Sequence, residues 1–269
     1  MRSVIEGMGD LVQHIHTIDQ TTSEVLTQLR NVGFDYVVDL HNNVRSRSVK
    51  RSLGLISFTV DKQNAAKWLL VRGWRKQPIH HIVERYIEAF SGAFGAKTPD
   101  NWPSLFTESS CAQTPTEPFI VIAIGATHAG KRLNSTIIDQ IVERETRQVI
   151  LVGGSDDQQQ GEAIQARHPQ VTQLAGKTTL AESSALLRAA EHVCTGDTGM
   201  MHLAAALGTP VTSFWGRTRP GLGMAPWQPA EGSRTVSPDE ILGPRPCSKL
   251  GNRSCRHTPS CMEQTAGVF

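Results

Sequence analysis

The chain has 269 residues, of which 39% are hydrophobic and 19% charged, a composition typical of a folded protein and not of a disordered one. Lys and Arg number 27 and Asp and Glu 25, so a net charge of +2 provides no broad basic field for nucleic-acid binding. No stretch approaches the roughly 18 apolar residues of a membrane span, and the N-terminus lacks the apolar segment of a secretory signal. We therefore expect a cytoplasmic protein whose five cysteines are mostly free thiols.

The first part of the chain predicts a mixed α/β region. In chain order, the pattern predicts a strand at 14–18, a helix at 22–31, a strand at 37–40, an apolar stretch at 65–71 and a helix at 79–90. Residues 96–118 then hold four prolines among Ser, Thr and Asn, which is typical of a linker. The sequence therefore predicts two domains, 1–112 and 113–269.

From residue 119 the chain becomes a regular alternation of strands and helices. We expect strands at 119–124, 148–152, 171–174, 192–195 and 211–215, and helices at 135–144, 157–167, 179–190 and 199–207. Strands joined by single helices pair in parallel, so this part is predicted to be a doubly wound, Rossmann-like domain. Such sheets bind ligands at the carboxyl ends of their strands.

The loop at 196–202, with the sequence Gly-Asp-Thr-Gly-Met-Met-His, joins a predicted strand to a predicted helix. The N–H groups of Thr198 and Gly199 are expected at the helix N-terminus, where the macrodipole favours an anion, and His202 lies one turn further. This arrangement predicts a phosphate site. The spacing supports equally an interpretation in which Asp197 only caps the helix and His202 packs against its neighbours.

Two other strand-end loops offer groups for the same ligand. Lys131, in the loop at 125–132, is a point charge suited to a diphosphate, but Arg132 stands where a Walker A loop has the Ser or Thr that binds Mg²⁺. Asp156 can accept hydrogen bonds from a ribose. Taken singly, each loop is explained as well by a solvated surface or by helix capping. No GxGxxG motif supports a nicotinamide dehydrogenase.

Three cysteines and a histidine gather in the tail, in the order Cys247, Cys255, His257, Cys261. These residue types can bind zinc, but the spacing lacks the short C-x2–4-C pairs of structural sites. Free thiols that pack a small C-terminal unit are therefore favoured over a metal. Trp68, Trp215 and Trp227 are interpreted as residues of the core or of domain contacts.

Residues 196–220 resemble the D-T-G-x-M-H-x-A-A-A-x-G-x-P signature, with its following F/W-G-x-T turn, of glycosyltransferase family 9. This family comprises the ADP-heptose–lipopolysaccharide heptosyltransferases of Gram-negative bacteria. Further segments resemble the family in the same order: 37–50, 122–133, 149–157 and the cysteine-bearing tail at 246–262. The resemblance extends over nearly the whole chain.

The resemblance implies an α/β protein of GT-B architecture, with two Rossmann-like domains of which the N-terminal one is incomplete. Residues 1–112 would form the acceptor side, and residues 113–269 would hold the nucleotide-sugar. The implied reaction transfers a heptose from an ADP-sugar to a lipopolysaccharide-core or related glycolipid acceptor, with inversion and without a metal or other cofactor. The implied location is the cytoplasm, with peripheral contact at the inner face of the membrane.

The resemblance also assigns roles to residues of this chain. Thr127 and Lys131 match residues that contact the donor phosphates, Asp156 matches an acidic residue that holds the ribose, and Thr178 falls near the adenine pocket. The signature around the diphosphate and sugar is matched by Asp197, Thr198, Gly199, Met200 and His202. The residues matched on the acceptor side are Asp39, Asn43 and Arg45.

An inverting transfer needs a base to deprotonate the acceptor hydroxyl. In the family this base is an aspartate in the first strand-to-helix loop, whereas this chain opens near what matches the third strand. About fifty to sixty residues, the size of one βαβ unit with its next helix, are therefore expected to be absent and the base with them. Asp10, in Met8-Gly9-Asp10-Leu11, is only a minor candidate because no buried strand precedes it.

Several alternatives stay open. A shortened chain of the same fold would be a catalytically impaired nucleotide-sugar-binding protein with an exposed sheet edge. A transferase or epimerase that uses a UDP-sugar is a third interpretation, and a phosphate-binding oxidoreductase is a distant fourth. A basic patch, Arg45, Arg47, Lys50 and Arg51, suits phosphorylated lipid headgroups, although a solvated face is the commoner explanation.

Overall fold

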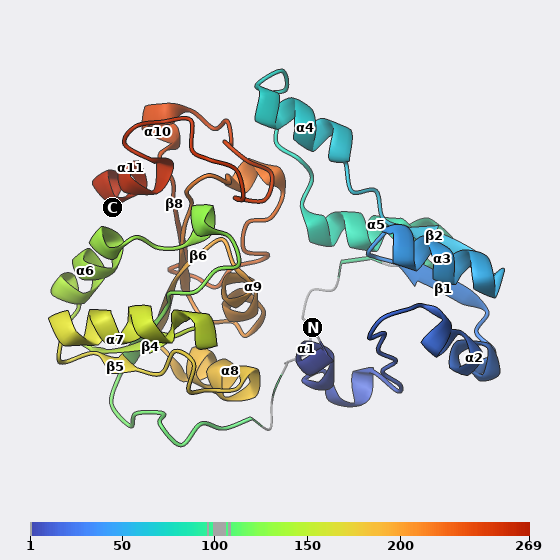
Figure 1. Ribbon diagram of the computed structural model, residues 1–269, viewed down its shortest axis with the longest axis horizontal. Helices are drawn as coiled ribbons and strands as arrows, with labels where there is room; N and C mark the ends of the chain where they lie inside the picture. The colour runs from blue at the N-terminus through green and yellow to red at the C-terminus, as the bar shows by residue number, and fades with distance from the viewer. Residues whose placement is uncertain (1, 96, 99–105, 107–108) are drawn as a thin grey trace. The chain divides into compact units, whose positions relative to one another are not determined.

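Six parallel strands form the larger sheet in the computed structural model, which describes residues 2–95, 97–98, 106 and 109–269 (Figure 1). Their order across the sheet is β5-β4-β3-β6-β7-β8, and each neighbouring pair is parallel. The strands are β3 (Phe119–Ala123), β4 (Gln148–Val152), β5 (Thr172–Gln173), β6 (His192–Gly196), β7 (Val211–Phe214) and β8 (Arg234–Val236). This is the predicted doubly wound topology, and it runs outward in both directions from the β3–β6 pair.

Helices cover both faces of this sheet. Side chains alternate between the two faces along each strand, so one strand packs with the helices on both sides. On β3, Ile120 and Ile122 pack with one set of helices, whereas Phe119 and Val121 pack with the other. The first set is α6 (Ser135–Arg144), α7 (Gln158–Arg167) and α11 (Cys261–Val268), and the second is α8 (Leu180–Ala189) and α9 (Gly199–Ala206). Burial on both faces explains why β3 is a continuous apolar run.

The shorter elements of this part are η2 (Ala129–Lys131), η3 (Ser155–Asp157), η4 (Pro220–Leu222) and α10 (Asp239–Leu242). The predicted helix at 135–144 and strand at 148–152 have the bounds of α6 and β4. Strand β8 and helix α11, which follow the signature segment, are not among the predicted elements. Trp215 is fully buried in the core, as predicted, whereas Trp68 is 47% exposed and does not belong to the core. Its predicted role in a domain contact stays a prediction.

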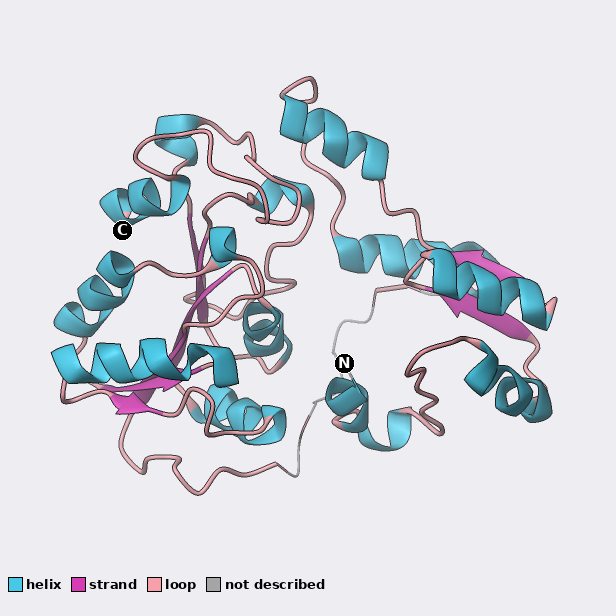
Figure 2. Cartoon of the chain, viewed as in Figure 1, coloured by secondary structure: helices cyan, strands magenta, loops and turns pink. Residues whose placement is uncertain are grey.

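Two parallel strands, β1 (Tyr36–Asp39) and β2 (Ile56–Thr59), form a second sheet near the N-terminus (Figure 2). The helical elements of this region are α1 (Arg2–Glu6), η1 (Gly9–Leu11), α2 (Ser23–Val32), α3 (Val44–Leu53) and α5 (Ile82–Phe94). Among the described residues β1 pairs with β2 alone. Tyr36 and Val38 on this strand are 49% and 43% exposed.

The expected strand at 14–18 is wrong, because the structure gives these residues no helix or strand. Alternating side chains make a strand only where a neighbouring strand pairs with its backbone. Helix α3 and strand β2 are likewise not among the predicted elements. Helix α3 buries none of its residues fully, so its sequence has no apolar stripe to reveal it.

The chain folds as two compact units, Met1–Asn64 with His80–Pro103 and Ala65–Ile79 with Ser104–Phe269. The second unit therefore includes most of α4 (Asn64–Arg72), a segment that the predicted domains place in 1–112. Leu70 and Ile79 pack there with Leu222, and Ile79 donates its N–H to the carbonyl oxygen of Gly221 at 2.8 Å. The predicted boundary at 112/113 itself stays a prediction, and much of the predicted linker lies outside the described residues.

Across the described part of the chain, no helix combines the length and the apolar composition needed to cross a bilayer.

Candidate functional site

The strand-end loops of the larger sheet hold most of the predicted site residues. Strands β3 and β6 are neighbours. The chain continues from β3 to β4 toward one edge of the sheet and from β6 to β7 toward the other edge. Open α/β sheets bind ligands at such a switch point, outside the carboxyl ends of the strands. The loops that follow β3 and β6 are those that carry Lys131 and Asp197.

The ammonium group of Lys131 and the carboxylate of Asp197 meet across this switch point, with Nζ and Oδ2 2.8 Å apart. The Asp197 side chain is 4% exposed and that of Lys131 is 21% exposed. The pair compensates the charge of a buried carboxylate and fixes the position of the lysine. An ammonium group has three N–H donors, so Lys131 retains the capacity to bind an anion in this position.

Three strand-end loops and the C-terminal segment approach one another so closely that only glycine fits at the contacts. A Cβ atom on Gly196 would lie 2.0 Å from the carbonyl oxygen of Lys131. A Cβ on Gly130 would lie 2.5 Å from the carbonyl oxygen of Gly251, and one on Gly216 would lie 2.7 Å from that of Gly130. Glycine therefore permits the β3, β6 and β7 loops to pack backbone to backbone.

Helix α9 begins directly after Asp197, with Thr198 as its N-cap residue. The Thr198 side chain makes no capping hydrogen bond, and its hydroxyl pairs with that of Thr195 at 3.1 Å. Gly199 is exposed, and no atom lies within 4 Å of where its Cβ would be. The interpretation of Asp197 as a simple helix cap is therefore wrong, since its carboxylate pairs with Lys131.

The remaining predicted residues of α9 are half-buried. Met200 packs at the border of the core formed with α8, and the next residue, Met201, is fully buried within it. His202 is half-buried in the first turns of the same helix. Both predicted residues thus lie on the helix whose N-terminus faces the switch point.

The β4 loop holds two adjacent aspartates with different surroundings. The predicted ribose-binding residue, Asp156, is exposed, as is Thr127 in the β3 loop. Asp157 is buried: its Oδ1 lies 3.1 Å from NH2 of Arg132, and its Oδ2 accepts the N–H of Gly154 at 2.9 Å. Asp157 therefore joins the β3 and β4 loops. This structural carboxylate could not be told apart in the sequence from its neighbour Asp156, which has the same side chain.

Thr178 and Thr179 lie at the start of α8. A capping box marks the start of the helix expected at 179–190: the Thr179 hydroxyl accepts the N–H of Glu182 at 3.2 Å, and the Glu182 carboxylate accepts the N–H of Thr179 at 2.8 Å. The hydroxyl of Thr178 pairs with that of Ser183 at 2.8 Å. Thr178 is half-buried at the carboxyl end of the sheet.

Arg219 is a buried residue of the signature turn that the sequence analysis did not single out. Its side chain has no exposure, and its Nε lies 2.7 Å from Oδ1 of Asp239. It also donates to the carbonyl oxygens of Gly216 and Thr218. The buried guanidinium of Arg219 therefore stabilises the conformation of this turn. Nothing in the sequence around Arg219 distinguishes it from an arginine on the surface.

In the N-terminal unit, Asp39 ends β1 and is 5% exposed. Its carboxylate accepts the N–H groups of His41 and Asn42 at 3.0 and 2.7 Å. It also lies 2.9 Å from the Lys50 ammonium and from the Ser46 hydroxyl. Burial acts to raise the pKa of Asp39. The N–H of Asn42 and then the other partners outweigh burial, and the pKa is lowered to about 2.

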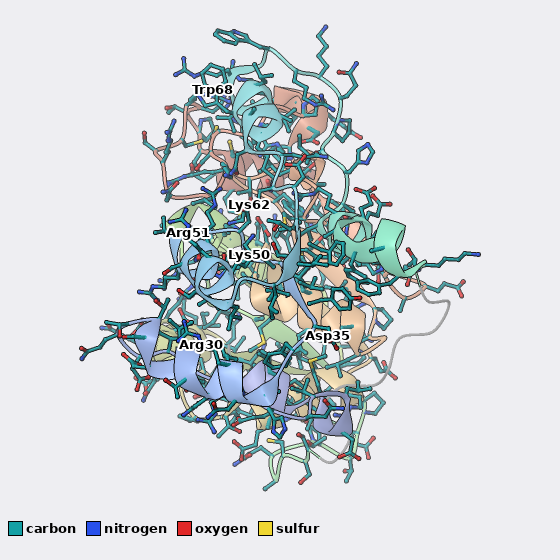
Figure 3. All side chains as sticks on the ribbon, turned by 90° about the vertical axis from the view of Figure 1, so that its right-hand side faces the viewer. Arg30, Asp35, Lys50, Arg51, Lys62 and Trp68 are labelled. Carbon is teal, nitrogen blue, oxygen red and sulfur yellow. The ribbon has the colours of Figure 1, made fainter. Side chains whose placement is uncertain are left out.

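The other predicted acceptor-side residues belong to the following helix, α3. Asn43 is its N-cap residue: its side chain accepts the N–H of Ser46 at 2.8 Å. Arg45 is exposed. Figure 3 labels Lys50 and Arg51 on α3 and Arg30 on α2, and Arg30 donates to the carbonyl oxygen of Ser52 at 3.1 Å. The contacts of Asp39 and Asn43 thus organise the turn between β1 and α3.

Asp10, the minor candidate for a base, is exposed in η1. A helix, α1, precedes it, in line with the expectation that no buried strand does.

The chain is similar to known proteins over most of its length. The profile of glycosyltransferase family 9 (heptosyltransferase) matches residues 23–249. The chain is 25% identical over 243 residues to lipopolysaccharide heptosyltransferase 1 of Pseudomonas aeruginosa, with 87% of this chain and 66% of that protein covered. It is 28% identical over 218 residues to lipopolysaccharide heptosyltransferase 2 of Escherichia coli, with 71% and 62% covered. The chain thus spans somewhat under two thirds of the length of these relatives.

Solved structures show the same fold. The structure of E. coli ADP-heptose lps heptosyltransferase II has a TM-score of 0.60 and 23% identity, with 80% of this chain and 72% of that chain covered. E. coli heptosyltransferase WaaC with ADP has a TM-score of 0.59 and 21% identity, with 80% and 69% covered. The predicted GT-B-like α/β fold class is confirmed by these neighbours.

Proposed function

Because the chain belongs to glycosyltransferase family 9, we propose that it takes part in transfer of a heptose from an ADP-sugar to a lipopolysaccharide-core or related glycolipid acceptor. The observation that carries the proposal is the Lys131–Asp197 pair, which lies at the switch point of the sheet beside the N-terminus of α9. The relatives named above are lipopolysaccharide heptosyltransferases, and one solved neighbour is described with ADP.

The donor would place its diphosphate between Lys131 and the first turn of α9. ADP is the leaving group of such a transfer, so negative charge grows on the diphosphate in the transition state. A fixed ammonium group and unpaired helix N–H groups stabilise this charge without reorganisation. With these groups we propose that no metal or other cofactor is required at the donor diphosphate, and that the acceptor attacks with inversion at the anomeric carbon.

The other predicted residues complete the proposed donor site. Thr127 would add a hydroxyl to the phosphates, Asp156 would accept from the ribose hydroxyls, and Thr178 would border the adenine. Met200 and His202 would face the diphosphate and the sugar from α9. The exposed positions of Thr127 and Asp156 at strand ends support these assignments.

For the acceptor we propose the N-terminal unit and the inner face of the cytoplasmic membrane. Arg45, Arg47 and Arg51 on α3 are exposed, and each basic residue near an anionic membrane surface contributes about 1 kcal/mol. Lys50 is excluded from this patch, because its side chain is only 14% exposed and its ammonium group is turned to the buried Asp39 carboxylate. Vesicles with anionic lipids should bind the chain more tightly than neutral vesicles, and Arg45→Ala with Arg51→Ala should remove most of the difference.

Calorimetric titration with ADP and with UDP tests the donor site. We expect ADP to bind in preference to UDP, and Lys131→Ala to weaken ADP binding about 10- to 100-fold, since a charged hydrogen bond contributes roughly 1.5–3 kcal/mol. Lys76→Ala, which removes an exposed lysine of the same unit, is the control and should bind ADP normally. Equal binding by both variants, or a preference for UDP, contradicts the proposal.

The reaction itself is tested with ADP-heptose and a heptose-accepting glycolipid, without added divalent cation. Mass spectrometry should detect the extended acceptor, and NMR of the new linkage should show the inverted anomeric configuration. The base that deprotonates the acceptor is unassigned, and Asp10→Asn tests its one minor candidate. ADP binding without any transfer would favour the alternative, a nucleotide-sugar-binding protein of the same fold.

A further inference from the structure

Four residues that can bind a metal come together in the C-terminal segment, outside the proposed donor site. The Sγ atom of Cys247 lies 3.9 Å from that of Cys255 and 3.4 Å from that of Cys261. The Sγ atoms of Cys255 and Cys261 are 3.2 Å apart. A ring nitrogen of His257 lies within 4.8 Å of the sulfur atoms of Cys247 and Cys261, whereas the sulfur of Cys255 is connected to this group of three only through the other two sulfur atoms.

These distances fit a shared metal better than a disulfide. A disulfide needs sulfur atoms about 2.05 Å apart, and it would leave one of the three thiols unused. Sulfur atoms bonded to a tetrahedral zinc at about 2.3 Å lie about 3.8 Å from one another, and the observed separations of 3.2, 3.4 and 3.9 Å are nearer to this value than to the length of a disulfide. Three cysteines and one histidine also make one of the ligand sets of structural zinc sites.

Two of the three sulfur atoms are buried, and the third accepts backbone N–H groups. Cys261 is fully buried and Cys247 is 4% exposed. The sulfur of Cys255 accepts the backbone N–H of Cys261 at 3.2 Å and also the backbone N–H of His257. Such donors stabilise negative charge on a metal-bound sulfur and orient the ligand.

The spacing alone had favoured free thiols, because seven residues separate Cys247 from Cys255. The fold removes this objection. The N–H of Cys247 is held by the carbonyl oxygen of Arg217 at 2.8 Å, and Cys261 is the first residue of α11, which packs on the sheet. Two parts of the core therefore bring the distant ligands together.

We propose that Cys247, Cys255, His257 and Cys261 bind one zinc ion as a closed structural site. Residues 243–260 contain no helix or strand, and a metal supplies the cross-link that such a segment lacks. The proposal concerns the stability of this segment and does not rest on the proposed function.

The segment closed by the metal is the one that supports Lys131. The carbonyl oxygen of Gly251 accepts the N–H of Gly130 at 3.2 Å, and a Cβ on Gly251 would lie 2.9 Å from Cγ of Lys131. Arg217 donates to the carbonyl oxygen of Arg253 at 3.0 Å. The zinc site therefore fastens the tail against the loop that carries the site lysine.

The test begins with the metal content of the full chain purified without added metal and without a metal-affinity tag. We expect about one zinc per chain. Replacement by Co²⁺ should give the thiolate-to-cobalt charge-transfer band and the strong visible bands of a tetrahedral site. Cys261→Ser should weaken zinc binding at least about 100-fold, since even a lost outer partner costs about 10- to 100-fold. Cys111→Ser, at a buried cysteine outside the cluster, should keep the metal.

Because Cys261→Ser removes a buried group and could unfold the tail, a conservative exchange provides the second test. His257→Cys offers a four-thiolate set at a half-buried position, and it should keep the zinc while it strengthens the charge-transfer band of the cobalt form. Three results overturn the proposal: a folded chain without bound zinc that also gives no tetrahedral cobalt spectrum, iron in place of zinc, or a cluster in which two cysteines resist alkylation as a disulfide.

Discussion

The contact between the β3 and β6 loops makes a quantitative prediction at Gly196. A Cβ there would lie 2.0 Å from the carbonyl oxygen of Lys131, whereas real Cβ atoms essentially never approach closer than 3.0 Å. The obstructing atom belongs to the backbone, so no side chain can rotate away, and the two loops must separate by about 1 Å. Overpacking in well-packed regions costs about 1–3 kcal/mol. We expect Gly196→Ala to lower the free energy of unfolding by about 3 kcal/mol, the upper end of this range.

The same loop offers a matched control three residues further on. A Cβ on Gly199 meets no atom within 4 Å, and Gly199 is the first residue of α9. Since alanine is a better helix former than glycine, Gly199→Ala should raise the free energy of unfolding by about 0.5 kcal/mol. Urea unfolding, followed by far-UV circular dichroism, measures both variants. Equal stabilities for the two variants would refute the inferred approach of the Lys131 backbone.

Three further substitutions, Asp39→Asn, Thr179→Ala and Asp157→Asn, test other contacts by urea unfolding. Asp39→Asn removes a carboxylate whose pKa is lowered from 3.8 to about 2 on folding, so its contribution of about 2 kcal/mol is present above pH 4 and is lost as the pH falls through 2. The destabilisation should be largest at neutral pH and vanish near pH 2, and Asp35→Asn, at an exposed site, should show none. Thr179→Ala breaks the capping box of α8 and should cost about 1 kcal/mol. Asp157→Asn should destabilise by about 1–3 kcal/mol, whereas Asp156→Asn should leave stability unchanged and weaken ADP binding about tenfold, as calorimetry can measure.

Where burial dictates the order of residues, the fold could be predicted from the sequence. Strand β3 is apolar throughout because helices cover both faces of its sheet, and α6 has an apolar stripe because one of its faces packs on that sheet. By contrast, α3 buries no residue fully, and the strand expected at 14–18 has no neighbouring strand among the described residues. Patterns of hydrophobicity predict elements that face a core and miss elements that lie on the surface.

The candidate site divides in the same way. The positions of Lys131 and Asp197 at strand ends follow from the alternation of strands and helices, but their 2.8 Å contact depends on which strands are neighbours. The roles of Asp156 and Asp157 could not be separated, because the two identical side chains follow each other in one short helical turn and only burial distinguishes them. The spacing of the cysteines and His257 in the sequence likewise does not predict the proposed zinc site, because packing on the core brings these residues together.

The geometry of the lysine at the switch point is set by parts of the chain that are far apart in sequence. The carboxylate of Asp197 fixes its ammonium group, and Gly196 admits its carbonyl oxygen. Gly251, in the segment that carries the cysteines, contacts the middle of its side chain. Because the lysine touches all three, a loosened C-terminal segment should disturb the donor site even though none of its residues is assigned to the donor. The cysteine-bearing tail and the signature loop therefore act on the same side chain, which gives a physical reason for their occurrence together in one chain.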